Sequence, residues 1–179
     1  EMIEQINPVL AAVVVSGSNP SASTMNMTGA GEIISLTKQL APDIKTILMG
    51  LHPSALPKRT IGDEEADFVC QGEGFLTLCQ LIDALKNNSD DFPIEGLWYK
   101  KDGQIISNPR PPILDDLDKL PQPAWDLLPM QKYRAHNWHC FDDISNRQPY
   151  GVLYTSLGCP FRCSFCCINS LFGKNTIRY

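Results

Sequence analysis

The sequence predicts an α/β fold, in which a Rossmann-like parallel sheet precedes a smaller second part. Residues 9–16 form a continuous, mostly β-branched apolar run, which is typical of a strand buried on both faces of a parallel sheet. An apolar stripe at helical spacing follows within residues 30–40. Strand-like and helix-like stretches then alternate, with short glycine-marked joints, up to about residue 86. This alternation indicates a doubly wound domain.

The elements of the first half can be placed in order. We expect two further strands at residues 45–49 and 67–70, and a second amphipathic helix at residues 75–85. Cys70 and Cys79 lie on the apolar stripes, so we expect both in the core. In such sheets, ligands bind outside the carboxyl ends of the strands. The candidate binding loops are therefore residues 16–19, 50–54 and 71–74.

The second half reads differently. A polar stretch at residues 87–91 predicts the end of the first domain, which we place at residues 1–89. Residues 96–107 predict a β-hairpin with an Asp-Gly turn. A proline-rich linker extends the second segment to residues 90–148. Residues 149–179 then predict the first strand of a partial (β/α) barrel, because the apolar run 150–156 reads as a buried strand.

Composition excludes several classes of function. The net charge is -5 and no cluster of Lys or Arg occurs, so the chain lacks the electrostatic footprint of nucleic-acid binding. No apolar run reaches the length of about 18 residues that a membrane span needs. Seven cysteines, an odd number and mostly clustered, argue against a secreted disulfide scaffold and favour a reducing cytoplasm.

Three thiols near the end of the sequence form its most informative motif. Cys159, Cys163 and Cys166 have the spacing Cys-x-x-x-Cys-x-x-Cys in one short loop. Thiolates are soft ligands that suit zinc or iron–sulfur clusters. Structural zinc sites use four ligands, whereas three thiolates on a four-iron cluster leave one iron open. Core packing, disulfide pairing, and a zinc site completed by Cys167, Cys140 or His139 are the alternatives.

This loop resembles the radical S-adenosylmethionine (radical SAM) superfamily in its cysteine spacing, in Gly158 before the first cysteine and in the aromatic Phe165. In that family, the open iron chelates the amino and carboxylate groups of SAM. An electron from the cluster splits the sulfonium to give a 5′-deoxyadenosyl radical. The resemblance implies that Cys159, Cys163 and Cys166 ligate a 4Fe-4S cluster and that Phe165 lies beside the adenine of SAM. It also implies an electron donor such as flavodoxin or ferredoxin.

About residues 5–88 resemble the cobalamin-binding domain that precedes many radical SAM cores. The likeness lies in residues 15–17, 47–57, 66–69 and 72–74. In that family, the loops wrap the corrin and its nucleotide tail. The implied cobalamin contacts are Ser16, Gly17, Ser18, Gly50, Leu51, His52, Gly72, Glu73 and Gly74. The Asp-x-His-x-x-Gly motif that often ligates cobalt is absent from the sequence. His52 can also be a loop histidine bonded to backbone, and Gly72–Gly74 can be a simple tight turn.

Together these resemblances predict a cobalamin-dependent radical SAM enzyme that acts on a small molecule and, as in many relatives, transfers a methyl group. The sequence does not begin with Met and ends soon after the cysteine loop, so we expect a fragment that is inactive alone. One alternative is a cobalamin-binding sensor module whose thiols hold structural zinc. Another is a radical SAM enzyme whose α/β domain has lost cobalamin.

Overall fold

The structure of the chain is a computed structural model, and it describes residues 2–16, 23–135, 145, 147–151 and 153–179. The chain divides into two compact units. The first comprises Glu1–Ile113 with Gly158–Ile177, and the second comprises Leu114–Leu157 with Arg178–Tyr179.

A five-stranded sheet with the order β1-β2-β3-β4-β5 forms the centre of the first unit. Strands β1 (Leu10–Val15), β2 (Lys45–Gly50) and β3 (Phe68–Cys70) run parallel to one another. Strands β4 (Leu97–Lys101) and β5 (Gln104–Ser107) are antiparallel additions. The parallel strands confirm the predicted α/β class.

The predicted hairpin is β4–β5, and it continues the same sheet. Its turn is formed by Asp102 and Gly103, both with positive φ (50° and 76°). Two successive positive φ values are what a tight hairpin turn of this kind requires, which explains the Asp-Gly pair.

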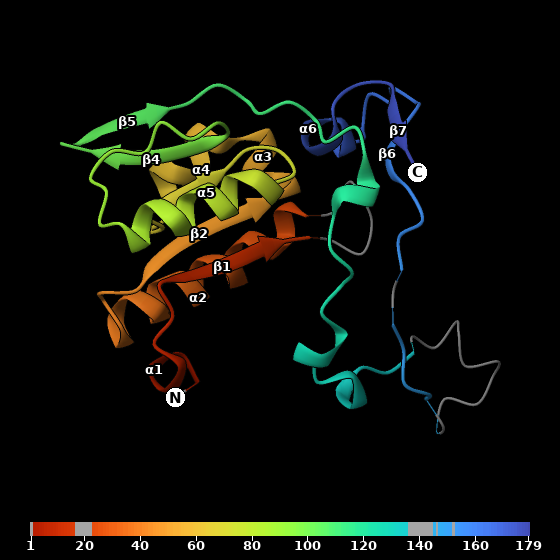
Figure 1. Cartoon of the computed structure of the whole chain (residues 1–179), viewed down its shortest axis with the longest axis horizontal. Coiled ribbons are helices and arrows are strands. Elements are labelled where there is room, and N and C mark those ends of the chain that lie inside the picture. Colours follow the sequence, from red (N-terminus) through yellow and green to blue (C-terminus); the bar gives the residue numbers. More distant parts are fainter. Residues whose placement is uncertain (1, 17–22, 136–144, 146, 152) are drawn as a thin grey trace. The chain divides into compact units, whose positions relative to one another are not determined.

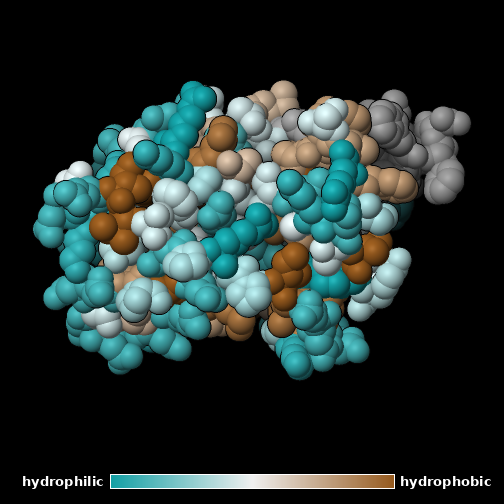
Figure 2. All heavy atoms as spheres, turned by 90° about the horizontal axis from the view of Figure 1, so that it is seen from above, coloured by the Kyte–Doolittle hydropathy of each residue, from teal (hydrophilic) through white to brown (hydrophobic). Residues whose placement is uncertain are grey.

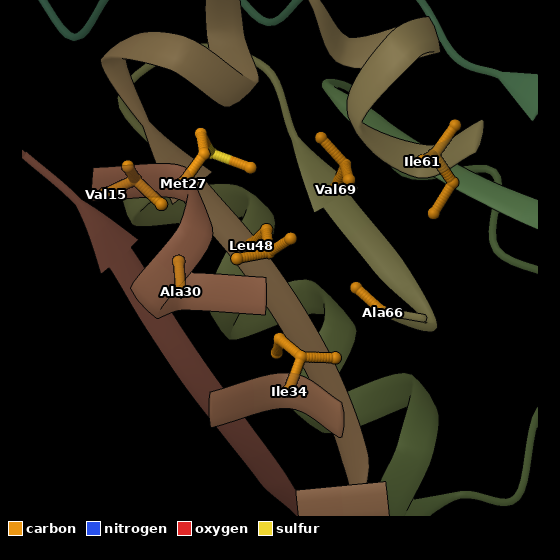
Figure 3. Packing of buried hydrophobic residues seen from close by; sticks show 8 residues of the cluster. All are labelled: Val15, Met27, Ala30, Ile34, Leu48, Ile61, Ala66 and Val69. Carbon is orange, nitrogen blue, oxygen red and sulfur yellow. The ribbon is translucent and has the colours of Figure 1, made fainter. Parts of the chain in front are cut away.

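Helices cover both faces of the sheet (Figure 1). The connecting helices are α2 (Met27–Leu40), α3 (Leu51–Ala55), α4 (Pro57–Asp63) and α5 (Phe75–Lys86), and a short α1 (Met2–Ile6) precedes β1. On one face, side chains from α2 and α4 pack on the strands. Figure 3 shows this cluster, which consists of Val15, Met27, Ala30, Ile34, Leu48, Ile61, Ala66 and Val69.

The opposite face of the sheet is covered by α5. Leu81 of this helix is fully buried against Ile47 and Met49 of β2. Phe92 packs edge-on against Phe68 and Tyr99, with ring centroids 5.1 and 5.5 Å apart. Strands with helices on both faces must be apolar on both sides, which is why β2 reads as a continuous apolar run.

The second unit is irregular. The described part of this unit includes the 3-10 segments η2 (Leu117–Lys119), η3 (Trp125–Leu127) and η4 (Met130–Lys132). The Arg147 guanidinium donates to the Ala135 carbonyl at 2.6 Å, beside the β-bridge between Arg134 and Pro149.

At the carboxyl end of the sequence, β6 (Leu157–Cys159) pairs with β7 (Thr176–Arg178), and α6 (Ile168–Phe172) lies between them in sequence. The strand predicted for residues 150–156 is wrong for the described part of that run, which forms no strand. Leu153 and Tyr154 are 71% and 78% exposed. A barrel strand is held by neighbouring strands, and the described residues supply none here.

On the face seen in Figure 2, hydrophilic residues predominate and apolar ones form separate patches. Among the described residues, no helix has the length and apolar character to cross a bilayer.

Candidate functional site

Strand β2 ends at Gly50, whose backbone has φ of +111°, and α3 follows directly; residues 50–54 are called the loop after β2 below. A Cβ at this position would lie 2.3 Å from the Val15 carbonyl oxygen, so only glycine fits. Gly50 thus lets the end of β2 pair closely with Val15 at the end of β1. The predicted residues Leu51 and His52 follow it in the first turn of α3.

The loop after β3 contains Gly72 and Gly74, both with positive φ (105° and 82°). A Cβ on Gly74 would lie 2.4 Å from the Met49 Cε atom, so this glycine shapes a tight loop against β2. Glu73 lies between them, half-buried. The positive φ values of Gly72 and Gly74 fit the expected tight turn, and a ligand-binding role of this loop stays a prediction.

Two hydrogen bonds to Ser54 tie these two loops together. The Gly72 amide donates to the Ser54 hydroxyl at 3.0 Å, and both residues are buried. The Gln71 side chain adds a donor to the Ser54 carbonyl at 3.4 Å and accepts from the Trp98 indole at 3.2 Å. Sequence reasoning placed Ser54 in the loop but missed this role, because the partner is 18 residues away.

His52 is half-buried, and its Nδ1 atom lies 3.0 Å from the Thr24 hydroxyl oxygen. Burial lowers the pKa of this histidine, and the nearby Arg59 guanidinium lowers it further. The neutral imidazole is therefore favoured near neutral pH. A neutral imidazole keeps one nitrogen able to accept a hydrogen bond or bind a metal.

The loop after β1 is described only at its start. The Ser16 carbonyl accepts a hydrogen bond from the Asn26 side chain, whereas Gly17 and Ser18 lie outside the described residues. A shallow cavity of about 430 Å³ adjoins Ser16. The cavity is lined by Val13, Val14, Val15, Ser16, Met25, Asn26, Gly29, Ala30 and Ile33.

A larger hollow of about 740 Å³ lies at the amino ends of β2 and β3 and contains none of the predicted site residues. Its wall includes Asp67, which pairs with the Lys38 ammonium and accepts hydrogen bonds from the Thr46 amide (2.7 Å) and hydroxyl (2.9 Å). These contacts give Asp67 a structural role. We therefore place the candidate site at the carboxyl ends of the strands.

The cysteine loop runs from β6 to α6. Gly158 has φ of +100°, and a Cβ there would lie 2.0 Å from the Thr176 carbonyl oxygen of β7. The glycine before the first cysteine is thus required by strand pairing. Within the loop, the Cys166 amide donates to the Cys163 carbonyl at 3.1 Å, which closes a turn between the second and third thiols.

The thiols of the loop are reachable. Cys159 and Cys166 are half-buried, Cys163 is exposed, and all three are free of disulfides. Phe165 is 79% exposed. Cys167 is half-buried and directly precedes α6.

The structure does not bring the three thiols into a ready-made ligand set. In the part of the chain that the structure describes, no group of three or more His, Cys, Asp or Glu side chains is placed to hold a metal ion. The donor type nevertheless suits an iron–sulfur cluster, because three thiols without disulfides lie in one loop and the second of them, Cys163, is exposed. His139 and Cys140, the alternative fourth zinc ligands, lie outside the described residues.

The cysteine loop belongs to the same compact unit as the sheet. Helix α6, which follows the last cysteines, contacts α3, which carries His52 and Ser54. The end of the cysteine loop, where α6 begins, therefore lies near α3.

The remaining described cysteines differ from each other. Cys70 is buried, and burial raises the pKa of its thiol to about 11 despite an opposing hydrogen bond with Thr77. This confirms its place in the core. The same prediction for Cys79 is wrong, because this residue is exposed on the outer side of α5, next to the exposed Leu76.

Comparison with known proteins identifies several relatives. An uncharacterized methyltransferase of Pyrococcus horikoshii is 36% identical over 155 residues, which cover 86% of this chain and 32% of the relative. Cytidylyl-2-hydroxyethylphosphonate methyltransferase of Streptomyces wedmorensis is 27% identical, with 82% and 31% covered. The anaerobic magnesium-protoporphyrin IX monomethyl ester cyclase of Rubrivivax gelatinosus is 27% identical, with 82% and 26% covered. The chain thus spans about a quarter to a third of the length of these curated relatives.

No protein-family model matches the chain. Among solved structures, the radical S-adenosylmethionine methyltransferase TsrM from Kitasatospora setae has a TM-score of 0.49 and 22% identity, over 57% of this chain and 19% of that one. One TsrM structure contains its tryptophan substrate and a SAM analog, and another contains cobalamin and a [4Fe-4S] cluster.

Proposed function

We propose that this chain belongs to the cobalamin-binding-domain-containing radical SAM proteins, and that it carries the cobalamin domain and the cluster loop of a radical SAM enzyme. Its relatives, which are named methyltransferases and a magnesium-protoporphyrin cyclase, support this proposal. The reaction would begin with reductive cleavage of SAM at a 4Fe-4S cluster. The observation that carries the proposal is the trio of free thiols, Cys159, Cys163 and Cys166, in one loop of the unit that contains the sheet.

In this proposal, those three thiols hold the cluster, and Cys167 does not. A bound 4Fe-4S cluster supplies the electron for SAM cleavage, and with three protein ligands it leaves one iron for the cofactor. The chain's own part is to keep the loop in place: Gly158 permits the β6–β7 pairing beneath it, and the Cys163–Cys166 turn sets the direction of its end. The exposed ring of Phe165 is free to stack on an adenine.

The loops at the carboxyl ends of the parallel strands would bind cobalamin. Gly50, Gly72 and Gly74 fix the loop backbones, and the Ser54–Gly72 hydrogen bond holds two loops at one spacing. His52, whose Nδ1 atom lies 3.0 Å from the Thr24 hydroxyl oxygen, would be one of the contacts. Bound cobalamin would serve as the methyl carrier.

Methyl transfer to a small molecule is the favoured outcome, because two of the relatives are named methyltransferases. An electron donor such as flavodoxin or ferredoxin would be needed to reduce the cluster. The sensor module with structural zinc is not supported by these relatives, which are named as enzymes.

Anaerobic reconstitution with iron and sulfide tests the proposal. We expect a brown chain with broad absorption at about 400 nm and about four irons, as thiolate-bound clusters show. A colourless chain that binds one zinc ion would refute the cluster. Titration with hydroxocobalamin tests the second cofactor separately: a shifted cobalamin spectrum supports the cobalamin site, and no change removes cobalamin from the proposal.

A further inference from the structure

Residues 108–113 leave the sheet after β5, and their first half is fixed to the sheet. The Pro109 carbonyl accepts a hydrogen bond from the Gly96 amide at 2.6 Å. A Cβ on Gly96 would lie 2.8 Å from the Pro111 Cδ atom, so the absence of a side chain there makes room for the proline ring. The path of the chain is therefore defined at this point.

The same proline ring borders the loop after β3. A Cβ on Gly72 would lie 3.4 Å from the Pro111 Cγ atom, in ordinary contact. The Gly72 amide is the group that donates to the Ser54 hydroxyl. Pro111 thus lies against the loop after β3, which is hydrogen-bonded to the loop after β2.

The neighbouring residue, Arg110, reaches α6. Its Nη2 atom donates to the Ser170 carbonyl at 2.7 Å and to the Leu171 carbonyl at 3.0 Å. The last carbonyls of a helix have no partner within the helix, and this end carries partial negative charge. A guanidinium is always charged and well suited to bind them. Arg110 therefore caps the carboxyl end of α6.

The far end of the segment also contacts the end of α6. Gly173 follows the helix with φ of +77°, and a Cβ there would lie 2.6 Å from the Ile113 Cδ1 atom. Helix α6 begins at Ile168, directly after Cys166 and Cys167. Whatever fixes α6 therefore also fixes the end of the cysteine loop.

We propose that residues 108–113 form a strap that holds the cysteine loop near the loop after β3, with Arg110 as the positioning residue of α6. This inference rests on the proposed function for its purpose, since it gives the cluster loop a fixed place beside the cobalamin loops. The strap itself stands on contacts that need no bound cofactor. Loss of the Arg110 guanidinium should loosen α6 and leave the two cores of the sheet intact.

Amide hydrogen exchange of the whole chain, without metal, tests the strap. Within α6, the Ser170 amide donates to the Cys167 carbonyl and the Gly173 amide donates to the Asn169 carbonyl. In Arg110→Ala, these two amides should exchange about five- to tenfold faster. A partly exposed hydrogen bond to a charged group stabilises a structure by about the free energy that this factor represents. The midpoint of urea unfolding should not move. Arg110→Lys, which keeps the charge and a donor, should restore part of the protection.

Lys101→Ala is the matched control, because it removes an exposed cation that pairs with Asp91 on the hairpin of the same unit. Equal α6 exchange in Arg110→Ala and Lys101→Ala would overturn the strap. Iron uptake by the unaltered chain is scored separately. If α6 exchange depends on Arg110 but the chain binds no cluster, the proposed function is refuted and the strap stands. If the chain binds a four-iron cluster but α6 exchange does not depend on Arg110, the strap is refuted and the proposed function stands.

Discussion

Replacing Ser54 by alanine should loosen the pair of loops that follow β2 and β3. Ser54 is 2% exposed, and its hydroxyl accepts the Gly72 amide at 3.0 Å. Alanine leaves that buried N–H without this acceptor. An unsatisfied buried donor costs about 1–3 kcal/mol, so we expect the free energy of unfolding to fall by about 2 kcal/mol.

Urea unfolding followed by far-ultraviolet circular dichroism measures this loss. Small proteins lose about 1–3 kcal/mol per molar urea, so a loss of about 2 kcal/mol lowers the midpoint by about 1 M. Ser35→Ala is the matched control, since its hydroxyl donates to Glu65 at an exposed site (2.6 Å). Such a surface change should stay within about 0.5 kcal/mol.

Two further readouts follow from the same hydrogen bond. The Gly72 amide should exchange faster in Ser54→Ala than in Ser35→Ala, and hydroxocobalamin should bind more weakly if these loops hold it. Equal unfolding midpoints together with unchanged Gly72 exchange would refute the reasoning that this bond couples the loops.

Three more predictions can be checked on the same chain. Cys163→Ala should abolish iron uptake during reconstitution and Cys167→Ala should not, and equal failure of both would disprove the ligand assignment. Gly50→Ala should lower the free energy of unfolding by more than about 2 kcal/mol, because a positive φ and a backbone clash combine, whereas Gly62→Ala in open space on α4 should be neutral or stabilising by about 0.5–1 kcal/mol in urea unfolding. Because the pKa of His52 is lowered below its ordinary value of 6.5 in the folded chain, the unfolded chain binds more protons there, so stability should fall as pH drops below about 6.5 toward the folded pKa. His52→Gln should flatten that part of the stability–pH curve, and an unchanged curve would contradict the shift.

Local patterns were enough to predict the parallel sheet. The apolar runs at residues 9–16 and 45–49 became β1 and β2. Burial on both faces explains the apolar run of β2. The expectation that the strand at residues 9–16 is buried on both faces is wrong, because β1 is an edge strand of the sheet and Ala12 and Val14 are exposed. The Asp102-Gly103 pair predicted the hairpin, since its turn needs positive φ at both residues.

Predictions that depended on a distant partner were weaker. The run 150–156 is apolar enough for a strand, but a strand also needs neighbouring strands, and the described residues of this run form no strand. Cys79 lies on a helical stripe that is only partly covered, so periodicity alone placed it wrongly.

The contacts that organise the site could not be seen in the sequence. Ser54 and Gly72 are 18 residues apart, and Arg110 and Ser170 are 60 apart, so no local pattern marks either pair. Gly158 was noticed through a resemblance, whereas its physical reason is the closeness of the Thr176 carbonyl across β6 and β7. The placement of the three thiols as cluster ligands stays a prediction.

Mössbauer spectroscopy of the air-free chain, reconstituted with iron-57, examines the central claim most directly. Our account predicts a four-iron cluster in which one iron differs from the other three and changes its spectrum when SAM is added. Four equivalent irons whose spectrum does not change when SAM is added, or bound iron without the spectrum of a cluster, would contradict the account.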